Sequence, residues 1–401
     1  MGFGGAMGPQ AEVGGIFLEL AETTMDRQQI ALDASRALAD AAGTLSSHVA
    51  TIGLDGFVDE ICAVVDKRHD PKSYEPIKTI AEFGQKVVRA AGQSSNYELV
   101  VKQMKLGGNG PIMANAMACA GMSVNYIGAV GYPSIHPVFE SFGKVAKLYP
   151  TSDPGHTDAV EFTDGKVMLG KITPCYEVNW TNVAARLGVG KLVELMGASS
   201  LIAMVNWTML PNMGEIWGHL KSDVFPKLPK RSDRNRLFFC DLADPEKRTA
   251  KDLLGGLRQL AEFQADVNVV LGLNLKESTQ VAEVLEIEVG KDPESQIERL
   301  AREIRQKLAI HTVVVHPRRG AAAADANGSA QFAGPFVASP KISTGAGDHF
   351  NAGFCLGRVL GMPLEQALAV GVATSGYYVR SAESPSAMQL SEFLANLPEP
   401  Q

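Results

Sequence analysis

The sequence lacks the features that would place it in a membrane or on a nucleic acid. Its 401 residues contain no uninterrupted hydrophobic run long enough to span a bilayer. Basic charge is not in excess, because 37 Lys and Arg residues stand against 44 Asp and Glu residues, which gives a net charge of −7. A chain of this charge has no electrostatic footprint for nucleic acid or anionic lipid. We therefore expect no nucleic acid and no membrane as partner.

Export signals and paired cysteines are also missing. Residues 1–15 have no basic side chain and no continuous apolar stretch, so they do not resemble a secretory signal peptide. The five cysteines are odd in number, and none lies in a C-x-x-C pattern: Cys62, Cys119, Cys175, Cys240 and Cys355. Both observations favour a cytoplasmic protein with reduced, mostly buried thiols.

Strands and helices alternate regularly in the second half of the chain. Short apolar segments typical of buried strands cover residues 200–206, 237–241, 267–272 and 312–316, with helical patterns between them. This alternation predicts an α/β fold with a mostly parallel central sheet flanked by helices. The strands end at or just before polar residues, namely Asn206, Asp241, Asn274 and His316. These side chains are expected along the edge of the sheet where α/β proteins bind ligands.

The first half of the chain predicts a leading helix, a core strand and a second, smaller sheet. The helix is expected over Met25–Leu45, and the strand over His48–Leu54 is followed by two carboxylates, Asp55 and Asp59. Four extended segments within about 60–67, 96–105 and 157–172 flank a helix over 77–91, and Asp164-Gly165 is a strong hairpin signal. We divide the chain into an N-terminal extension (1–45), a main domain (46–395) and a tail (396–401).

The most informative motif runs from Ser343 to Phe354, where a turn of small residues precedes an aspartate and an apolar helical pattern. The Gly345-Ala346-Gly347 backbone leaves room for N–H groups to close on an anion at the start of a helix. Asp348 then lies in the first helical turn, beside the bound anion. A carboxylate beside a bound anion is unfavourable because the two negative charges repel each other, so its presence there indicates a chemical role. The role that fits is to accept the proton of an attacking hydroxyl. The alternative is a glycine-rich connection with Asp348 as a helix cap.

A second pair of polar residues follows the strand at 267–272. Asn274 and Glu277 lie three residues apart on one face of the predicted helix. They fit a capping box, in which each side chain bonds the other's backbone N–H. Together with the Gly345–Asp348 turn, they also fit a water-bound Mg²⁺ near phosphates. The sequence contains no Walker A motif, and Ser343 and Thr344 do not lie in a G-x-S-x-G elbow.

With these residues assembled, the chain resembles the ribokinase-like (PfkB) carbohydrate kinase family from about Val49 to Leu394. The resemblance is carried by the glycine pair Gly107-Gly108 before a helix, the N-x-x-E pattern at Asn274 and Glu277, and the G-A-G-D signature at Gly345–Asp348. It implies a ribokinase-like α/β domain with a small β-sheet lid that closes over a sugar, and it allows a homodimer formed through the lid. It also implies ATP-dependent phosphorylation of a hydroxyl group of a sugar-like small molecule.

The resemblance further implies roles for individual residues. Asp348 would be the base, and the backbone of Gly345, Ala346 and Gly347 would stabilise the transferring phosphoryl group. Glu277 would act on Mg²⁺ through water. The nucleotide is expected at Asn274, His316, Arg318, Gly320, Thr344 and Asn351, and the acceptor at Asp55, Asp59, Gly108, Asn109 and Asn206. Of the two carboxylates after the first strand, Asp59 fits the family pattern better than Asp55.

The chain departs from the family pattern at several positions. Ile112 stands where the family usually has an Asn, which predicts an unusual acceptor pocket. Ile342 stands where relatives that need potassium carry an Asp, which argues against a potassium site. His316-Pro317-Arg318 replaces the usual Thr-x-Gly and adds positive charge near the nucleotide phosphates.

Two other functions remain open from the sequence. The acceptor could be a nucleoside or a pyridoxal-type alcohol, with Phe57, Tyr126 and Trp207 as candidate aromatic contacts. The chain could also be a sugar- or nucleotide-sensing protein without activity, but the intact Asp348 and Gly345–Gly347 argue against that reading. Turnover across a panel of acceptors separates these alternatives.

Overall fold

A computed structural model describes residues 11–230 and 236–400, and side chains from residue 26 onward. Residues 1–10 of the expected extension, residues 231–235 and the last residue of the tail lie outside the described part. In the described residues, the main sheet has nine strands in the order β14-β13-β12-β11-β10-β9-β1-β5-β6. Their bounds are β1 Val49–Leu54, β5 Ser123–Gly128, β6 Lys147–Pro150, β9 Leu201–Met204, β10 Leu237–Asp241, β11 Asn268–Leu273, β12 Thr312–Val315, β13 Gly320–Ala324 and β14 Ser329–Ala333.

The main sheet is parallel from β12 to β6, and β13 and β14 extend it as antiparallel strands at one edge. The predicted α/β fold with a mostly parallel central sheet is therefore confirmed. No strand was predicted at β13, whose sequence is Gly-Ala-Ala-Ala-Ala. Alanine has a weak preference for strands, and this segment is held in the sheet because its alanines are buried on both faces.

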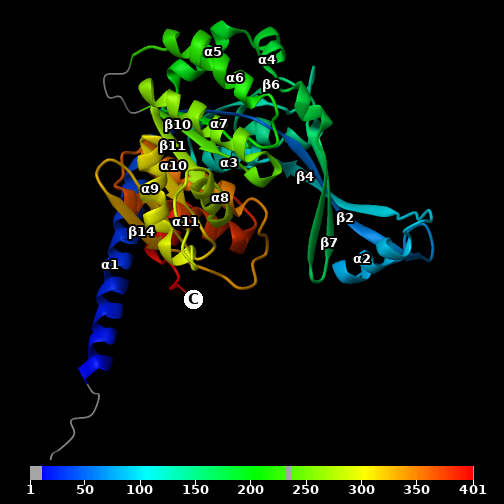
Figure 1. The fold of residues 1–401 in the computed structure, drawn as a ribbon, viewed down its shortest axis with the longest axis horizontal. Helices are drawn as coiled ribbons and strands as arrows, with labels where there is room; N and C mark the ends of the chain where they lie inside the picture. Colours follow the sequence, from blue (N-terminus) through cyan, green and yellow to red (C-terminus); the bar gives the residue numbers. More distant parts are fainter. Residues whose placement is uncertain (1–10, 231–235, 401) are drawn as a thin grey trace, which may run out of the picture.

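A second, smaller sheet forms the lid, which projects to one side of the main body (Figure 1). It contains β2 (Phe57–Arg68), β3 (Tyr74–Pro76), β4 (Leu99–Gly107), β7 (Gly155–Phe162) and β8 (Gly165–Lys171), with α2 (Ile80–Arg89) packed on it. The predicted hairpin is present, since Phe162 pairs with Gly165 across a two-residue turn. Asp164 in this turn also accepts a hydrogen bond from the N–H of Ile80, 2.8 Å away, which fixes the start of α2.

Helices cover both faces of the main sheet, because successive strand residues point to opposite sides. Leu201 and Ala203 of β9 belong to one hydrophobic cluster, and Ile202 and Met204 belong to the other. The first cluster lies under α1 (Ala11–Ala41), α3 (Asn109–Ala120), α10 (Ala346–Val359), α11 (Leu364–Ser381) and α12 (Ala387–Ala395). The second lies under α4 (Trp180–Arg186), α5 (Val189–Ala198), α6 (Met213–His219), α7 (Ala250–Glu262), α8 (Leu275–Val284) and α9 (Ile297–Leu308).

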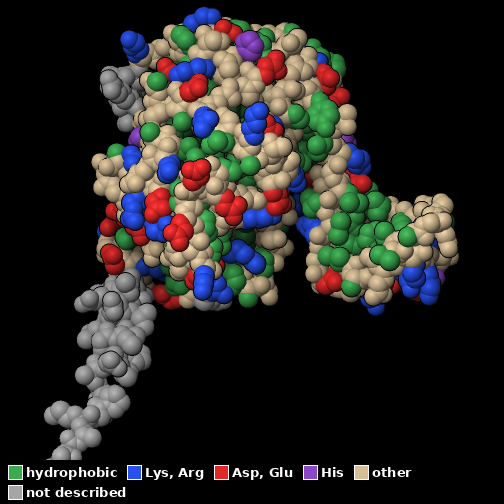
Figure 2. Space-filling view, viewed as in Figure 1, with side chains coloured by type: hydrophobic (Ala, Val, Ile, Leu, Met, Phe, Trp, Pro, Cys, Tyr) green, Lys and Arg blue, Asp and Glu red, His purple; other side chains and the backbone are tan. Residues whose placement is uncertain are grey.

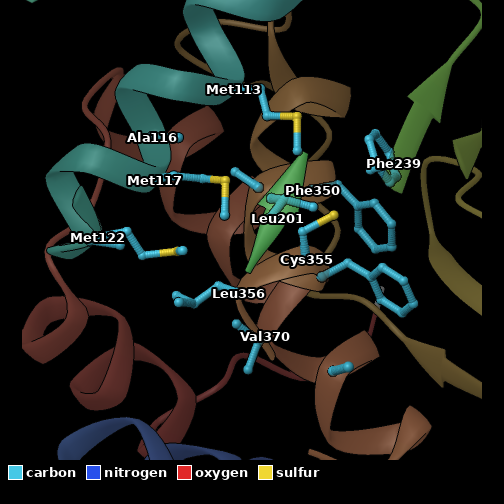
Figure 3. Packing of buried hydrophobic residues seen from close by; sticks show 14 of the residues in the cluster. Met113, Ala116, Met117, Met122, Leu201, Phe239, Phe350, Cys355, Leu356 and Val370 are labelled. Carbon is cyan, nitrogen blue, oxygen red and sulfur yellow. The ribbon is translucent and has the colours of Figure 1, made fainter. Parts of the chain in front are cut away.

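Close packing of α3 on α10 fixes the two helices whose first turns reach the candidate site. Met113 and Met117 of α3 lie toward Cys355 and Leu356 of α10 (Figure 3), and all four side chains are buried. Flexible methionine side chains fill irregular space between helices well. The N-termini of α3 and α10 are thereby held on one rigid support.

The leading helix is longer than the sequence predicts, since α1 begins at Ala11 and ends at Ala41. Its described part packs into the first cluster through Ala31, Ala34 and Leu38. Arg27 donates to the carbonyl oxygens of Ala333 at 2.9 Å and Pro398 at 2.8 Å. The helix therefore joins the β14 edge of the sheet to the C-terminal segment. In the described residues, no helix has the length and hydropathy needed to cross a membrane.

Candidate active site

A cavity of about 660 Å³ lies at the carboxyl ends of the main-sheet strands, where the lid faces them. This size is typical of small-molecule sites. Its walls come from the main domain and from the lid strands β2, β7 and β8. Most of the residues singled out in the sequence line it: Asp59, Gly108, Asn109, Asn206, Asn274, Glu277, His316, Arg318, Gly320, Thr344, Gly345, Ala346, Gly347 and Asp348. Asp55 and Asn351 do not line it, and of the three candidate aromatic contacts only Phe57 does, whereas Tyr126 and Trp207 do not.

The turn from Ser343 to Asp348, here called the glycine turn, starts α10 at the floor of this cavity. Gly345 is the N-cap residue, with a φ of +87° that side-chain-bearing residues rarely adopt. A Cβ at this position would meet Ile112 at 3.2 Å and the Tyr378 hydroxyl at 3.3 Å. The turn brings backbone N–H groups and the positive end of the α10 dipole to the cavity, an arrangement that favours anions.

Asp348 lies in the first turn of α10, buried but lining the cavity. The Asn109 side-chain amide donates a hydrogen bond of 2.9 Å to its carboxylate. Burial raises the pKa of Asp348 to about 8, and the nearby carboxylates of Asp55 and Glu277 add to the rise, whereas the bond from Asn109 opposes it. A carboxyl group poised near neutral pH, beside an anion-binding turn, is suited to proton transfer.

Asp55 and Asp59 occupy different environments. The carboxylate of Asp55 is fully buried and accepts hydrogen bonds from the N–H of Asn109 and of Gly110, both at 2.9 Å, and from the Asn206 side chain at 2.7 Å. It therefore ties the start of α3 to the end of β9 and does not reach the cavity. Asp59 faces the cavity from β2, paired across the strands with Lys105 and Thr157. Burial raises the pKa of Asp59, and the charge of Lys105 opposes the rise.

Asn274 and Glu277 form the capping box at the start of α8, as one of the two sequence interpretations predicts. The Glu277 carboxylate accepts from the N–H of Asn274 at 2.9 Å and of Asp244 at 3.0 Å. Burial raises the pKa of Glu277, and the neighbouring carboxylate of Asp241 raises it further. Burial likewise raises the pKa of Asp241, with Asp348 adding to the effect. Repulsion among these acidic groups would be relieved by a cation.

The described residues do not group three or more Asp, Glu, His or Cys side chains in a way that could enclose a metal ion. Glu277 and Asn274 nevertheless line the cavity together with Asp241. Because Mg²⁺ takes few protein oxygens and keeps several waters, this donor set fits an ion held largely through water. Asn351 does not line the cavity, and instead donates a 2.8 Å hydrogen bond to the Asp241 carboxylate.

One end of the cavity is suited to a flat, mostly apolar group. It is lined by Pro335, Phe336, Val337, Val372, Gly376 and Val379, next to His316 and Arg318. A Cβ at Gly376 would meet Pro335 at 2.5 Å, so glycine is needed for α11 to approach this wall. The glycine turn has neighbours on both sides, because Asp348 accepts from Asn109 at 2.9 Å and a Cβ at Gly347 would meet the His316 ring at 3.4 Å.

Sequence reasoning missed some residues that the fold brings to the glycine turn. Lys166 of the lid donates to the Thr344 hydroxyl at 3.2 Å, and the Tyr378 hydroxyl donates to the Thr344 carbonyl at 3.0 Å. Thr157 and Met168 of the lid line the cavity as well. No spacing in the chain predicts these contacts, because Lys166 is 178 residues from Thr344.

The mostly parallel main sheet, the separate strand lid and the cavity between them are the features of the ribokinase-like (PfkB) class of fold. Solved structures with this fold include a mutant of phosphofructokinase-2 from Escherichia coli (TM-score 0.59, 17% identity, 87% of this chain and 98% of that chain). Ribokinase from Arabidopsis thaliana, complexed with ribose and ATP, is also similar (TM-score 0.56, 14% identity, 86% and 98%). A third is a nucleoside kinase from Methanocaldococcus jannaschii (TM-score 0.56, 15% identity, 87% and 98%).

Sequence comparison gives the family within this class. The model of prokaryotic ketohexokinase matches residues 27–397, so the chain belongs to the prokaryotic ketohexokinase family. A ketohexokinase from Haloferax volcanii is 29% identical over 346 residues, which cover 85% of this chain and 89% of that protein. The chain is thus a phosphotransferase with an alcohol group as acceptor, and membership of this family implies the use of ATP.

Proposed function

We propose that the protein transfers the γ-phosphoryl group of ATP to a hydroxyl group of a ketohexose such as fructose. The observation that carries this proposal is the match of the prokaryotic ketohexokinase family over residues 27–397. The site supports it, because Asp59, Asn109 and Asn206 offer a carboxylate and two amides to a polyhydroxylated acceptor. Ile112 adds an apolar surface to the same pocket. The reaction is in-line transfer, in which positioning and electrostatics supply most of the catalysis.

Asp348 is the proposed general base, and the N–H groups of Gly345 and Gly347 are the proposed stabilisers of charge on the transferred group. The Ala346 N–H, which the resemblance also assigned to this role, donates instead to the Ser343 carbonyl oxygen at 3.2 Å. The Asn109 amide, at 2.9 Å from Asp348, orients the carboxylate toward the acceptor. Asp55 does not contact the acceptor itself. It acts indirectly, because it fixes the backbone of Asn109 and the side chain of Asn206. Asp59, Gly108 and Asn206 also line the cavity and are the further proposed contacts of the acceptor.

In this proposal, ATP binds with its base at the apolar residues of the cavity and its phosphates at the glycine turn. His316, Arg318, Gly320, Thr344 and Asn274 line this part of the site. Mg²⁺ bound with the nucleotide would neutralise phosphate charge, and Glu277 would hold its waters. The Ile342 side chain offers no oxygen ligand where potassium-dependent relatives carry an Asp, so we expect turnover without a requirement for potassium.

The acceptor is tested by measuring ATP-dependent turnover on ketohexoses, aldohexoses, a nucleoside and pyridoxal. We expect the highest kcat/KM with a ketohexose. A preference for the nucleoside or pyridoxal would show that the acceptor is wrong but the kinase class right. No turnover on any member, with specific binding in a thermal-shift assay, would favour the sensing protein instead.

The activity is expected to rise with pH. Burial raises the pKa of Asp348 to about 8, and a general base acts only when it is deprotonated. We therefore expect kcat/KM to increase about tenfold per pH unit below pH 8 and to level off above it. A pH profile of kcat/KM checks this expectation, and the residual activity of Asp348→Asn should lose the same dependence. A flat wild-type profile between pH 6 and 8 would contradict it.

We also propose that the outer face of the lid binds a second copy of this chain. Met104 and Leu169 lie on the face opposite Asp59, in a row with Glu60 and Asp158, as the strand pairing shows. Met104 is 58% exposed and Leu169 is 47% exposed. Hydrophobic side chains gather on the lid in Figure 2, and the exposed ones include Val87, Val88, Leu99, Val101, Met104 and Leu169. Such a patch is typical of an interaction surface, and a two-fold axis would bury two equal copies of it.

The double variant Met104→Glu/Leu169→Glu should halve the molar mass measured by light scattering. Met388→Glu is the matched control, because Met388 is 51% exposed on the main body and lies outside the lid. A wild-type protein that is monomeric at micromolar concentration, or a double variant that keeps the wild-type mass, would contradict the proposal.

A further inference from the structure

Two stacked aromatic side chains lie beneath the glycine turn. The rings of His349 from α10 and Tyr378 from α11 are nearly parallel, at 12°, and their centroids are 3.6 Å apart. His349 is 2% exposed. Neither residue lines the cavity, so neither is placed to touch substrate. Both are nevertheless hydrogen-bonded to the glycine turn.

Each of the two side chains holds one carbonyl group of the turn. The Tyr378 hydroxyl donates to the carbonyl oxygen of Thr344 at 3.0 Å. His349 Nδ1 lies 2.8 Å from the carbonyl oxygen of Gly345, which also accepts from the His349 backbone N–H at 3.0 Å. Because a peptide group is planar, fixing its carbonyl fixes the N–H of the next residue. Tyr378 thus sets the direction of the Gly345 N–H. His349 sets that of the Ala346 N–H, which donates to the Ser343 carbonyl oxygen at 3.2 Å and so closes the turn.

The hydrogen-bond partners assign the tautomer of His349. A carbonyl oxygen can only accept, so Nδ1 carries the proton. Nε2 then accepts from the Ser384 hydroxyl, 2.9 Å away, and the Ser384 oxygen accepts from the Asn115 amide at 3.3 Å. Every donor in this chain of bonds has an acceptor, from Asn115 on α3 to the glycine turn. The same helix α3 begins at Asn109, which orients Asp348.

A turn of small residues needs such support. Gly345 has a φ of +87°, and glycine visits many other backbone conformations at little cost. N–H groups stabilise a developing charge best when they already point at it before the reaction. The hydrogen bonds from His349 and Tyr378 exclude these alternative conformations. Gly345 can therefore keep its φ of +87° although it has no side chain of its own to restrict the backbone.

We propose that His349 and Tyr378 are positioning residues: His349 keeps the glycine turn closed through the peptide group between Gly345 and Ala346, and Tyr378 fixes the direction of the Gly345 N–H for phosphoryl transfer. The proposal rests on the kinase function proposed above and deepens it, but it is independent of which alcohol is the acceptor. The two side chains act on the rate of transfer and not on the binding of either substrate.

The test compares Tyr378→Phe, which keeps the stacked ring, with His349→Leu, which removes both the stacking and the donor. We expect each to lower kcat roughly tenfold or more while KM for acceptor and nucleotide changes little, because only the geometry of the turn is altered. His349→Asn should recover much of the loss, since its amide can replace Nδ1 as a donor to Gly345. Tyr377→Phe is the matched control, because Tyr377 lies on the same helix and packs against Phe393.

Slow hydrolysis of ATP without acceptor is measured on the same variants and separates this inference from the choice of acceptor. A parallel loss of hydrolysis supports the inference even if no ketohexose is turned over. Unchanged kcat in both Tyr378→Phe and His349→Leu would overturn it. The inference would also be overturned if His349→Asn and His349→Leu lost kcat equally and both showed lower melting temperatures and raised KM values. That result would mean that His349 and Tyr378 stabilise the fold and do not position the turn.

Discussion

Asp348→Asn is expected to lower kcat on the order of a hundredfold or more and to leave nucleotide binding nearly unchanged. The substitution keeps the shape of the side chain and an oxygen that can accept the 2.9 Å hydrogen bond from Asn109. It removes only the ability to take up a proton from the acceptor hydroxyl. Steady-state turnover gives the loss, and calorimetric titration with ATP or a non-hydrolysable analogue gives the nucleotide affinity.

Asp325→Asn is the matched control for this loss. Asp325 is also a buried carboxylate, but it pairs with Arg358 at 3.1 Å and does not line the cavity. Its substitution should lower the melting temperature, because it leaves Arg358 without its partner, and kcat should stay within about twofold. Full activity of Asp348→Asn on the best acceptor would refute the assignment of the base. Equal losses in both variants would point to a general loss of folded protein.

Gly345→Ala is expected to lower kcat by about a hundredfold or more, the range seen when a donor of an anion hole is removed. An alanine would have to keep a φ of +87°, which costs about 1–2 kcal/mol. Its Cβ would also meet Ile112 at 3.2 Å and the Tyr378 hydroxyl at 3.3 Å. The turn therefore has to shift, and its N–H groups no longer point at the transferred phosphoryl group.

Gly188→Ala separates backbone strain from the effect on the site. Gly188 has a φ of +88° and also precedes a helix, but a Cβ there meets nothing within 4 Å. We expect both variants to unfold at somewhat lower temperature than the wild type and only Gly345→Ala to lose turnover. Retention of wild-type kcat by Gly345→Ala would contradict the proposed role of the turn.

Features that depend on a few neighbouring residues could be predicted from the sequence. The Gly345–Asp348 turn at the start of a helix and the hairpin were predicted and are present, although the hairpin turn is Thr163-Asp164 and not Asp164-Gly165. The capping box of Asn274 and Glu277 was one of two interpretations of that pair, and it is present. Each depends on backbone conformations and hydrogen bonds within three or four positions. The parallel sheet was predictable for a similar reason, since alternating strands and helices leave few other connections.

Contacts between distant segments could not be predicted in this way. The sequence favours Asp59 over Asp55 only narrowly as an acceptor contact. In the structure the bonds from Asn109 and Asn206 hold Asp55 away from the cavity, whereas Asp59 lines it. Similarly, the sequence does not predict that Tyr378 contacts the glycine turn, because this contact depends on the packing of α11 against α10. The alanines of β13 do not predict a strand from the sequence, and they form one because they are buried on both faces of the sheet.

The sequence by itself thus determined the chemical parts of this carbohydrate kinase: the anion-binding turn, its aspartate, the capping pair and the two kinds of sheet. The tertiary structure alone decided which carboxylate faces the cavity, what orients Asp348 and what holds the turn still. The physical reason is distance along the chain. Asn109 and Asp348 are 239 residues apart, and their contact exists only because α3 and α10 pack on one side of the same sheet.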